Sequence, residues 1–346
     1  MTTPTKTSSL PANETKNAAI EVKNLKKWFP VQKGWLEQTL AGKVDYVHAV
    51  DGVSFEIKRG EVLGLAGESG SGKTTIGRLV LRLLEPTEGQ IIFDSDDITH
   101  LQDEPLRKLR RRMQVVFQDP FASLNPRMTI GDQIAHPHQI HIPATSEERR
   151  NAVEKMMEQV GLTPARQIYD KFPHQLSGGM RQRAALARAL VTIPELVVAD
   201  EPIAMADVSV RALLLDLMIQ MKNELELTYL FITHDLATAK YICDRIGVLY
   251  LGRMAEIGDL DQVYGNPLHP YTQALLEAVP VPDPKYRRTT AMPKGEIPNP
   301  INPPSGCRFH PRCPIAQANC AVDEPELREL RPGQSVACHY AEQFLK

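Results

Sequence analysis

The sequence predicts an α/β domain built on a parallel sheet, followed by a small cysteine-bearing extension. Strand-like and helix-like patterns alternate over residues 20–265, and four of the five cysteines lie within residues 305–346. Residues 1–19 are rich in Thr, Ser, Pro and Asn and are expected to form a disordered lead-in rather than a signal peptide. Residues 266–304 are expected to contain a helix and then an extended, proline-rich linker.

The bulk composition is that of a globular protein and excludes several classes. The chain has 346 residues, of which 42% are hydrophobic and 24% are charged. A formal net charge of -2 argues against binding to nucleic acid through bulk positive charge. No apolar run approaches the roughly 20 residues that span a bilayer. We therefore expect a cytosolic body that binds no nucleic acid.

A glycine-rich turn follows the first buried strand, which is expected at residues 61–66. Residues 67–74, Gly-Glu-Ser-Gly-Ser-Gly-Lys-Thr, fit the pattern G-x-x-x-x-G-K-[ST] between a strand and a helix. The glycines let backbone N–H groups point at phosphate oxygens, and the helix N-terminus favours an anion. A turn that only connects strand to helix is the alternative, which this context disfavours. The predicted ATP contacts are Gly67, Glu68, Ser69, Gly70, Ser71, Gly72, Lys73, Thr74 and Thr75, with Thr74 also on Mg²⁺.

Two helices are expected from apolar spacing. The first follows the glycine-rich turn and should end near Pro86, and the second should cover residues 147–160 and end at Gly161. The first buries one face made of Ile76, Leu79, Val80, Leu83 and Leu84; the second buries Val153, Met156 or Met157, and Val160.

Two carboxylates come directly after the buried strand at residues 196–199. Ligands of open parallel sheets bind at such strand ends. Asp200 is predicted to hold Mg²⁺, directly or through water, and Glu201 to polarise the attacking water, because phosphoryl transfer needs positioning and charge neutralisation. Two solvated acids that open a loop are the alternative, which the upstream phosphate loop disfavours. A further buried strand is expected at residues 229–232.

A second Ser-Gly turn opens another helix at residues 176–183, Leu-Ser-Gly-Gly-Met-Arg-Gln-Arg. It is either a capped helix alone or a second phosphate-contacting surface, since serine is a good N-cap and the glycines expose N–H groups. A chain that already carries one phosphate loop would use the second surface on a nucleotide bound by a partner chain. The predicted contacts are Ser177, Gly178, Gly179 and Met180.

Together these motifs resemble the nucleotide-binding subunit of an ABC transporter. Residues 67–74 resemble its Walker A motif, residues 196–201 its Walker B motif with the catalytic glutamate, and residues 177–183 its signature. The resemblance implies a P-loop NTPase with a RecA-like core, an antiparallel β subdomain and a helical subdomain. It assigns the Q-loop glutamine, the switch histidine and the D-loop aspartate to Gln118, His234 and Asp207. It further implies that Glu201, His234 and Gln118 are catalytic, and that Thr74, Gln118 and Asp200 hold Mg²⁺.

The finer resemblance is to the oligopeptide/dipeptide subfamily, and within it to the second, F-type ATPase subunit. Residues 121–127, 207–211 and 268–276 and the cysteine-bearing tail carry it. It implies a second, different ABC ATPase chain, two transmembrane permeases and an extracytoplasmic binding protein, with this chain on the cytoplasmic side of the plasma membrane. Peptides are the implied cargo. Oligosaccharides, nickel or other solutes are the alternative, because the partners select the cargo. A soluble ATPase acting on ribosomes or DNA would usually carry two nucleotide domains or a long inserted coiled coil, which this sequence lacks.

The resemblance also assigns roles outside the main motifs. Trp28 or Phe29 would stack on adenine, with the choice open, and Val47 would touch the base. Residues 119–133 would contact a permease helix. The D-loop, residues 204–207, reads Ala-Met-Ala-Asp where the family usually has Ser-Ala-Leu-Asp. This departure affects communication between the two sites, yet the chain's own site is expected to hydrolyse ATP.

The tail spacing is Cys307-x5-Cys313-x6-Cys320-x17-Cys338, whereas Cys243 stands alone. Structural zinc usually shows tight cysteine pairs, and the wider gaps here are closer to a four-cysteine iron–sulfur site. The subfamily resemblance implies a [4Fe-4S] cluster, with zinc and free cysteines as alternatives. The flanking Arg308, His310 and Arg312 are expected to offset the negative charge of the thiolates and cluster. So short a tail has too little core to fold unaided.

Overall fold

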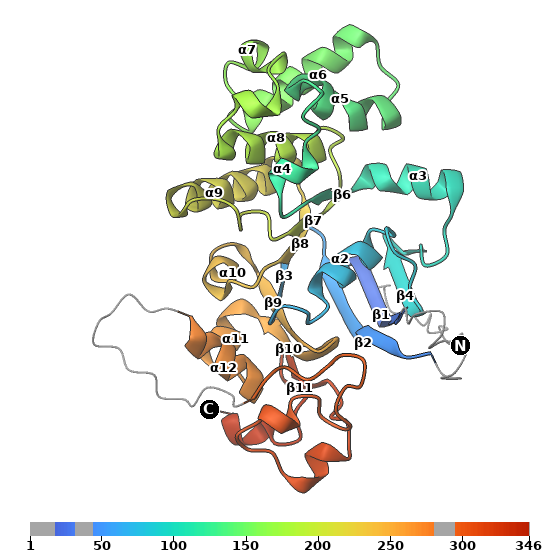
Figure 1. The fold of residues 1–346 in the computed structure, drawn as a ribbon, viewed down its shortest axis with the longest axis vertical. Coiled ribbons are helices and arrows are strands. Elements are labelled where there is room, and N and C mark those ends of the chain that lie inside the picture. Colours follow the sequence, from blue (N-terminus) through green and yellow to red (C-terminus); the bar gives the residue numbers. More distant parts are fainter. Residues whose placement is uncertain (1–17, 32–43, 280–294, 346) are drawn as a thin grey trace, which may run out of the picture.

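The main sheet places the ends of its parallel strands at one edge. The computed structural model describes residues 18–31, 44–279 and 295–345 (Figure 1). In this part of the chain the main sheet has the strand order β11-β12-β10-β9-β3-β8-β7-β6. The parallel strands are β9 (Arg245–Tyr250), β3 (Val62–Ala66), β8 (Thr228–Ile232), β7 (Leu196–Asp200) and β6 (Met113–Val116). All residues of β3 and β8 are buried, as expected for a sheet covered on both faces. The three buried strands predicted from sequence are confirmed.

The cysteine-bearing tail continues this sheet. Its hairpin, β11 (Arg328–Arg331) and β12 (Gln334–Val336), adds to β10 (Arg253–Asp259), so that Glu256 pairs with Val336. The Glu256 side chain is fully buried, and its carboxylate accepts hydrogen bonds from the backbone N–H groups of Leu268 and His269 and from the amide of Gln334, at 2.8, 3.0 and 2.8 Å. Burial raises the pKa of this carboxyl group. A single carboxylate thus joins the sheet, the start of the last helix and the tail.

A second, antiparallel sheet packs against the main one. Its order is β2-β1-β4-β5, with β2 at Tyr46–Lys58, β1 at Ala18–Pro30, β4 at Glu88–Phe93 and β5 at Asp96–Asp97. Residues of both sheets and of helix α2 (Lys73–Val80) share one hydrophobic core. The second sheet and α2 lie side by side in Figure 1.

Helix α2 is shorter than the sequence predicted. It ends at Val80 instead of near Pro86, and Leu83 is 45% exposed. Arg82 takes a left-handed backbone conformation, and its buried guanidinium donates to the carbonyls of Leu84, Ile98 and Leu101 at 3.2, 2.9 and 3.2 Å. These hydrogen bonds stabilise a non-helical turn at Arg82 instead of a further turn of α2. Leu83 is therefore not part of the buried apolar face that the sequence predicted.

A helical lobe lies at the end of the molecule farthest from the tail (Figure 1). The segments here are α3 (Asp103–Arg112), α4 (Pro120–Ser123), α5 (Ile130–His141), α6 (Ser146–Gln159), α7 (Ala165–Tyr169), the 3₁₀ turn η1 (Pro173–Gln175), α8 (Gly178–Leu190) and α9 (Val208–Leu225). Helix α6 confirms the second predicted helix. Thr145 and Glu148 form a capping box at its start, and Gly161 follows it with a left-handed φ of 78°.

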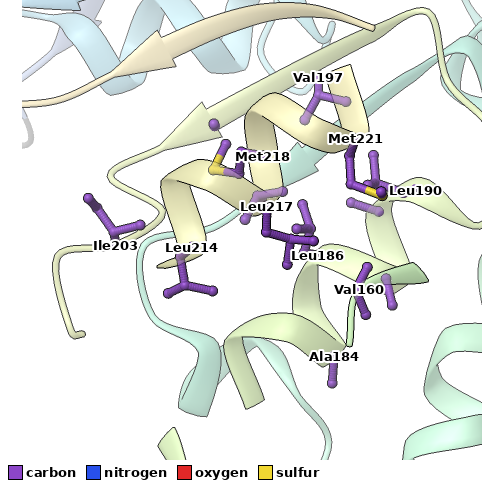
Figure 2. Close-up of a cluster of buried hydrophobic side chains, with 14 of the residues drawn as sticks. Val160, Ala184, Leu186, Leu190, Val197, Ile203, Leu214, Leu217, Met218 and Met221 are labelled. Carbon is purple, nitrogen blue, oxygen red and sulfur yellow. The ribbon is translucent and has the colours of Figure 1, made fainter. Parts of the chain in front are cut away.

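Packing between α8 and α9 fixes the lobe on the main sheet. Leu214, Leu217, Met218 and Met221 of α9 face Leu186 and Leu190 of α8 (Figure 2). Val197 of β7 belongs to the same buried cluster. The N-terminus of α8, which begins after Ser177, is therefore held in a set position relative to β7.

The remaining elements include three helices that follow β8 and the short turns of the tail itself. They are α10 (Leu236–Ile242), α11 (Leu260–Gly265), α12 (Pro270–Ala278) and the 3₁₀ turns η2 (His310–Arg312), η3 (Ala318–Ala321) and η4 (Ala341–Phe344). Among the described residues, no helix is both long and apolar enough to cross a membrane. The predicted disordered lead-in up to residue 17 and the linker over residues 280–294 lie outside the described residues. The prediction that the lead-in reaches residue 19 is wrong, because β1 already begins at Ala18 and Ala19 is buried.

Candidate active site

The phosphate loop joins the end of β3 to the start of α2, and two of its glycines are required by close contacts. Gly67 has a φ of 146°, and a Cβ there would lie 2.2 Å from the carbonyl oxygen of Leu249. Gly72 has a φ of 104°, and a Cβ there would lie 2.3 Å from the carbonyl oxygen of Ala49. Neither position tolerates a side chain, because the obstacle in each case is backbone. The loop is thus held between β9 and β2.

Lys73 lies inside the loop. Its side chain is buried, and its ammonium donates hydrogen bonds to the carbonyl oxygens of Gly67 and Glu68 at 2.8 and 3.0 Å. Burial lowers the pKa of this lysine, while the nearby carboxylates of Glu201 and Asp200 act in the opposite direction. A buried cation within a curled backbone is suited to binding phosphate oxygens.

Thr74 and Asp200 come together as predicted. The Thr74 hydroxyl donates to Asp200 Oδ1 at 3.0 Å, across the junction between α2 and β7. Burial raises the pKa of the Asp200 carboxyl, and the hydrogen bond from Thr74 opposes this shift. Hydroxyl and carboxylate oxygens are the ligands that Mg²⁺ prefers, so this pair fits the predicted metal role.

Glu201 lies between the other two predicted catalytic residues. The Gln118 amide donates to Glu201 Oε2 at 2.8 Å, and His234 Nδ1 lies 3.0 Å from Glu201 Oε1. Gln118 follows β6 and His234 follows β8, the two strands that flank β7 in the sheet. Glu201 itself takes a left-handed φ of 49°, which turns its side chain at the strand end. Three adjacent strand ends thus bring two residues that are distant in sequence to the Glu201 carboxylate.

Thr74, Gln118 and Asp200 line a cleft between the main sheet and the helical lobe, whereas Glu201 and His234 line a separate, smaller pocket. The cleft has a volume of about 730 Å³, and its lining includes Thr74, Gln118, Asp200, His136 and Arg188. In the structure the Gln118 amide donates to Glu201, so the contact of Gln118 with Mg²⁺ stays a prediction. The arrangement can bind a phosphate chain at the loop, hold a cation at Thr74 and Asp200, and orient water with Glu201.

The signature turn lies in the helical lobe rather than at the phosphate loop (Figure 1). Ser177 caps α8, accepting a hydrogen bond from the Met180 N–H at 3.3 Å, and both Ser177 and Gly178 are exposed. Asp207 occupies the N-cap position of α9, and the preceding Met205 is 58% exposed. The predicted cap is confirmed, and the partner-facing role of this surface stays a prediction.

The two aromatic candidates for adenine stacking differ in their contacts. The Trp28 ring stacks on His48 at 4.6 Å, and its Nε1 donates to Asp51 at 3.1 Å. Phe29 is half-buried and pairs across the sheet with Val47, so these two side chains share a face of the β1–β2 ribbon.

The four tail cysteines converge without forming a recognisable metal group. All are free thiols that line one small cavity, and burial raises the pKa of Cys307 and of Cys338 to about 11. In the part of the chain that the structure describes, no group of three or more His, Cys, Asp or Glu residues is arranged to hold a metal ion. The predicted [4Fe-4S] cluster is therefore not confirmed.

The tail arginines have a different role from the predicted one. Arg308 pairs with Asp51, and Arg312 pairs with Glu68 of the phosphate loop. The expectation that they offset thiolate charge is wrong, because each guanidinium already has a carboxylate partner. Sequence reasoning missed these pairs; the only available signal was the position of the arginines beside Cys307 and Cys313.

The fold and the site define an ATPase of the ABC class. A family model described as ABC transporter matches residues 50–204, and one described as Oligopeptide/dipeptide transporter, C-terminal region, matches residues 255–320. The chain is 49% identical over 323 residues to the oligopeptide transport ATP-binding protein AppF of Bacillus subtilis (strain 168), covering 92% of this chain and 96% of that protein. It is 53% identical to a putative peptide import ATP-binding protein of Brucella ovis, covering 84% and 90%. The chain therefore belongs to the oligopeptide/dipeptide branch of the ABC transporter ATP-binding proteins and is an ATPase.

Solved structures agree with this assignment. A dimeric ATP-binding cassette in a post-hydrolysis state, bound to ADP and phosphate, is 30% identical with a TM-score of 0.60, covering 70% of this chain and 98% of its own. The cbiO1 protein of Clostridium perfringens, part of the ABC transporter complex cbiONQ, is 27% identical with a TM-score of 0.61, covering 72% and 92%. The α/β nucleotide-binding fold predicted from sequence is confirmed.

Glu201→Gln is expected to lower the ATP hydrolysis rate by about 10²–10⁴-fold, because an amide cannot polarise the attacking water as a carboxylate does. ATP affinity should be retained, since the loop and Lys73 are unchanged. Steady-state phosphate release and equilibrium binding of a fluorescent ATP analogue measure the two quantities. Glu224→Gln, at an exposed position of α9, serves as the control. Turnover in Glu201→Gln equal to that of the control would show that another group activates the water.

Proposed function

We propose that this chain hydrolyses ATP as one of two ATPase subunits that drive an importer of oligopeptides from the cytoplasmic face of the plasma membrane. The observation that carries the proposal is the Glu201 carboxylate, held between Gln118 and His234 beside the Thr74–Asp200 pair. The names of the curated relatives, which are oligopeptide and peptide transport proteins, support the cargo.

Within one chain the roles divide by position. The loop N–H groups and Lys73 bind the phosphates, while Thr74 and Asp200 would hold Mg²⁺, which bridges phosphate oxygens and neutralises their charge. Glu201 orients the water. The histidine at 234 is 61% exposed and bonds to Glu201, so it can reach both this carboxylate and the γ-phosphate. Phe29, with Val47 beside it, is the proposed adenine platform, because Trp28 already stacks on His48 and bonds to Asp51.

The second half of the site would come from another ATPase chain. The exposed Ser177 turn, with free N–H groups at a helix N-terminus, is suited to a phosphate chain held by a partner's loop. A dimer is reported for the similar cassette bound to ADP and phosphate. We propose that the partner is a different, related subunit. A D-loop that faces a different chain need not keep the sequence Ser-Ala-Leu-Asp, and here it reads Ala-Met-Ala-Asp.

The permeases would dock on the cleft between the lobe and the sheet. Its rim includes Asp119, Ala122 and Ser123, next to the Gln118 that bonds the catalytic carboxylate. A permease helix seated there would shift Gln118 and so connect transport to hydrolysis. An extracytoplasmic binding protein would deliver the peptide.

Purification of the tagged chain from membranes in mild detergent is expected to yield a second ATPase and two permeases bound to it.

In proteoliposomes, peptide-loaded binding protein should raise the ATPase rate. Lys73→Ala should abolish peptide uptake, because it removes the buried cation of the loop. Lys58→Ala, at an exposed position of β2, should leave uptake unchanged. Stimulation by an oligosaccharide or nickel in place of peptide would contradict the proposed cargo, and failure to find permeases would contradict the importer.

We also propose that the four tail cysteines bind a [4Fe-4S] cluster. They surround one cavity, and thiolates are the ligands such clusters use. A single zinc ion would draw four sulfurs to about 2.3 Å from one centre, whereas a cluster keeps its ligand sulfurs farther apart. The wide spacing of the four cysteines in the sequence favours a cluster over zinc. Its role would be to hold the tail, which has little core of its own.

Protein purified without air is expected to contain about four iron and four sulfide per chain, in keeping with one cubane cluster. Cys313→Ser should lose this content, because it removes one ligand. Cys243→Ser is the matched control, since Cys243 is buried beside β3 near Gly64. One zinc per chain with no iron would contradict the cluster.

A further inference from the structure

The tail segment Cys307–Cys313 contacts the phosphate loop through a two-point ion pair. Arg312 Nη1 donates to Glu68 Oε2 at 2.8 Å, and Arg312 Nη2 donates to Glu68 Oε1 at 3.1 Å. Two parallel bonds between a guanidinium and a carboxylate fix geometry as well as charge. The Arg312 side chain is 9% exposed and that of Glu68 is 27% exposed, so the pair is partly shielded from solvent.

Aromatic packing holds the segment in place. Phe309 is 2% exposed and lies edge-on to Tyr250 at 5.2 Å and tilted against Tyr271 at 5.4 Å. Tyr250 ends β9, and Tyr271 lies in the first turn of α12. The guanidinium of Arg312 also donates to the Tyr250 hydroxyl at 3.3 Å. The position of Arg312 is therefore fixed by contacts with β9 as well as by its ion pair with Glu68 of the loop.

Glu68 is held by its backbone as well as by its side chain. Its N–H donates to the Tyr271 hydroxyl at 2.8 Å, and its carbonyl oxygen accepts a hydrogen bond from the Lys73 ammonium at 3.0 Å. A displacement of Glu68 therefore moves the atom that orients the phosphate-binding lysine. Its carboxylate also belongs to a loop that binds anions, and a nearby cation is needed to offset that charge.

The same segment reaches a second wall of the site. Arg308 pairs with Asp51 of β2 and donates to the carbonyl oxygen of Leu251, and both side chains of this pair are more than nine-tenths buried. Asp51 in turn accepts the hydrogen bond from Trp28. The two arginines that flank Phe309 thus join the tail to both β2 and the phosphate loop.

We infer that Arg312 is a positioning residue for ATP binding: the segment Cys307–Cys313 supports the phosphate loop through the Arg312–Glu68 pair. Arg312 acts on the nucleotide through Glu68. It holds the loop carbonyl that orients Lys73, and it neutralises a carboxylate that would otherwise repel the phosphates. The inference rests on the proposed function of residues 67–74 as the nucleotide site.

The test is a double-mutant cycle on the full chain, read as the dissociation constant of a fluorescent ATP analogue with Mg²⁺. Arg312→Gln is expected to raise the dissociation constant about tenfold, because it leaves the partly buried Glu68 carboxylate unpaired. Glu68→Gln should weaken binding less, since it leaves no bare anion. In the Glu68→Gln background, Arg312→Gln should have almost no further effect. Arg312→Lys should restore most of the affinity, because it returns the charge.

Controls separate this inference from general destabilisation and from the proposed function. Arg328→Gln breaks a solvent-exposed ion pair with Glu342 in the same tail and should leave affinity unchanged. Thermal unfolding of each variant identifies any loss of fold, and if Arg312→Gln fails to fold it is replaced in the cycle by Arg312→Met, which also removes the charge. Wild-type protein that does not bind the analogue would contradict the nucleotide site itself. Wild-type affinity in Arg312→Gln, or an equal loss in both backgrounds, would overturn the inference.

Discussion

The curled conformation of the phosphate loop is the constraint on which the rest of the site depends. Because the N–H groups of such a loop face inward, its carbonyls and side chains face the surrounding protein. Contacts with other parts of the chain hold the loop in this conformation. Gly67 and Gly72 allow backbone carbonyls of β9 and of β2 to approach closely. Lys73 satisfies two loop carbonyls from inside, and the tail holds Glu68 from outside. The loop is thus determined by parts of the chain that are distant in sequence.

The order of the sheet explains why hydrolysis and docking can communicate. Strand β7 carries Asp200 and Glu201 and lies between β6 and β8, so the residues that follow these neighbours converge on the same carboxylate. Gln118 begins the connection into the helical lobe, so a shift of that connection would change the contacts of Glu201. The packing of α8 on α9 and β7 joins the helix that begins at the Ser177 turn to the same core.

Much of the site could be predicted from sequence because its motifs are local. The phosphate loop, the acidic strand end and the cap at Ser177 each depend on a few consecutive residues whose conformations follow from glycine, burial and capping. The end of α2 could not be predicted this way, because the carbonyls that bind Arg82 come largely from the later residues Ile98 and Leu101. The Arg312–Glu68 pair was equally inaccessible, since its members are 244 residues apart and only tertiary packing brings them together. For the same reason, the β10–β12 pairing that joins the tail to the main sheet was not foreseen.

The most direct test of the account is the specific ATPase activity of the purified chain, measured per chain from nanomolar to micromolar concentration and then with the partner ATPase added. In the proposed dimer, Glu201 and the phosphate loop form one face of the site, and the Ser177 turn would contact the nucleotide of the other chain. The account predicts activity that vanishes on dilution and rises when the partner is added. Activity per chain that stays constant on dilution and ignores the partner would contradict it, because a single chain would then contain a complete site.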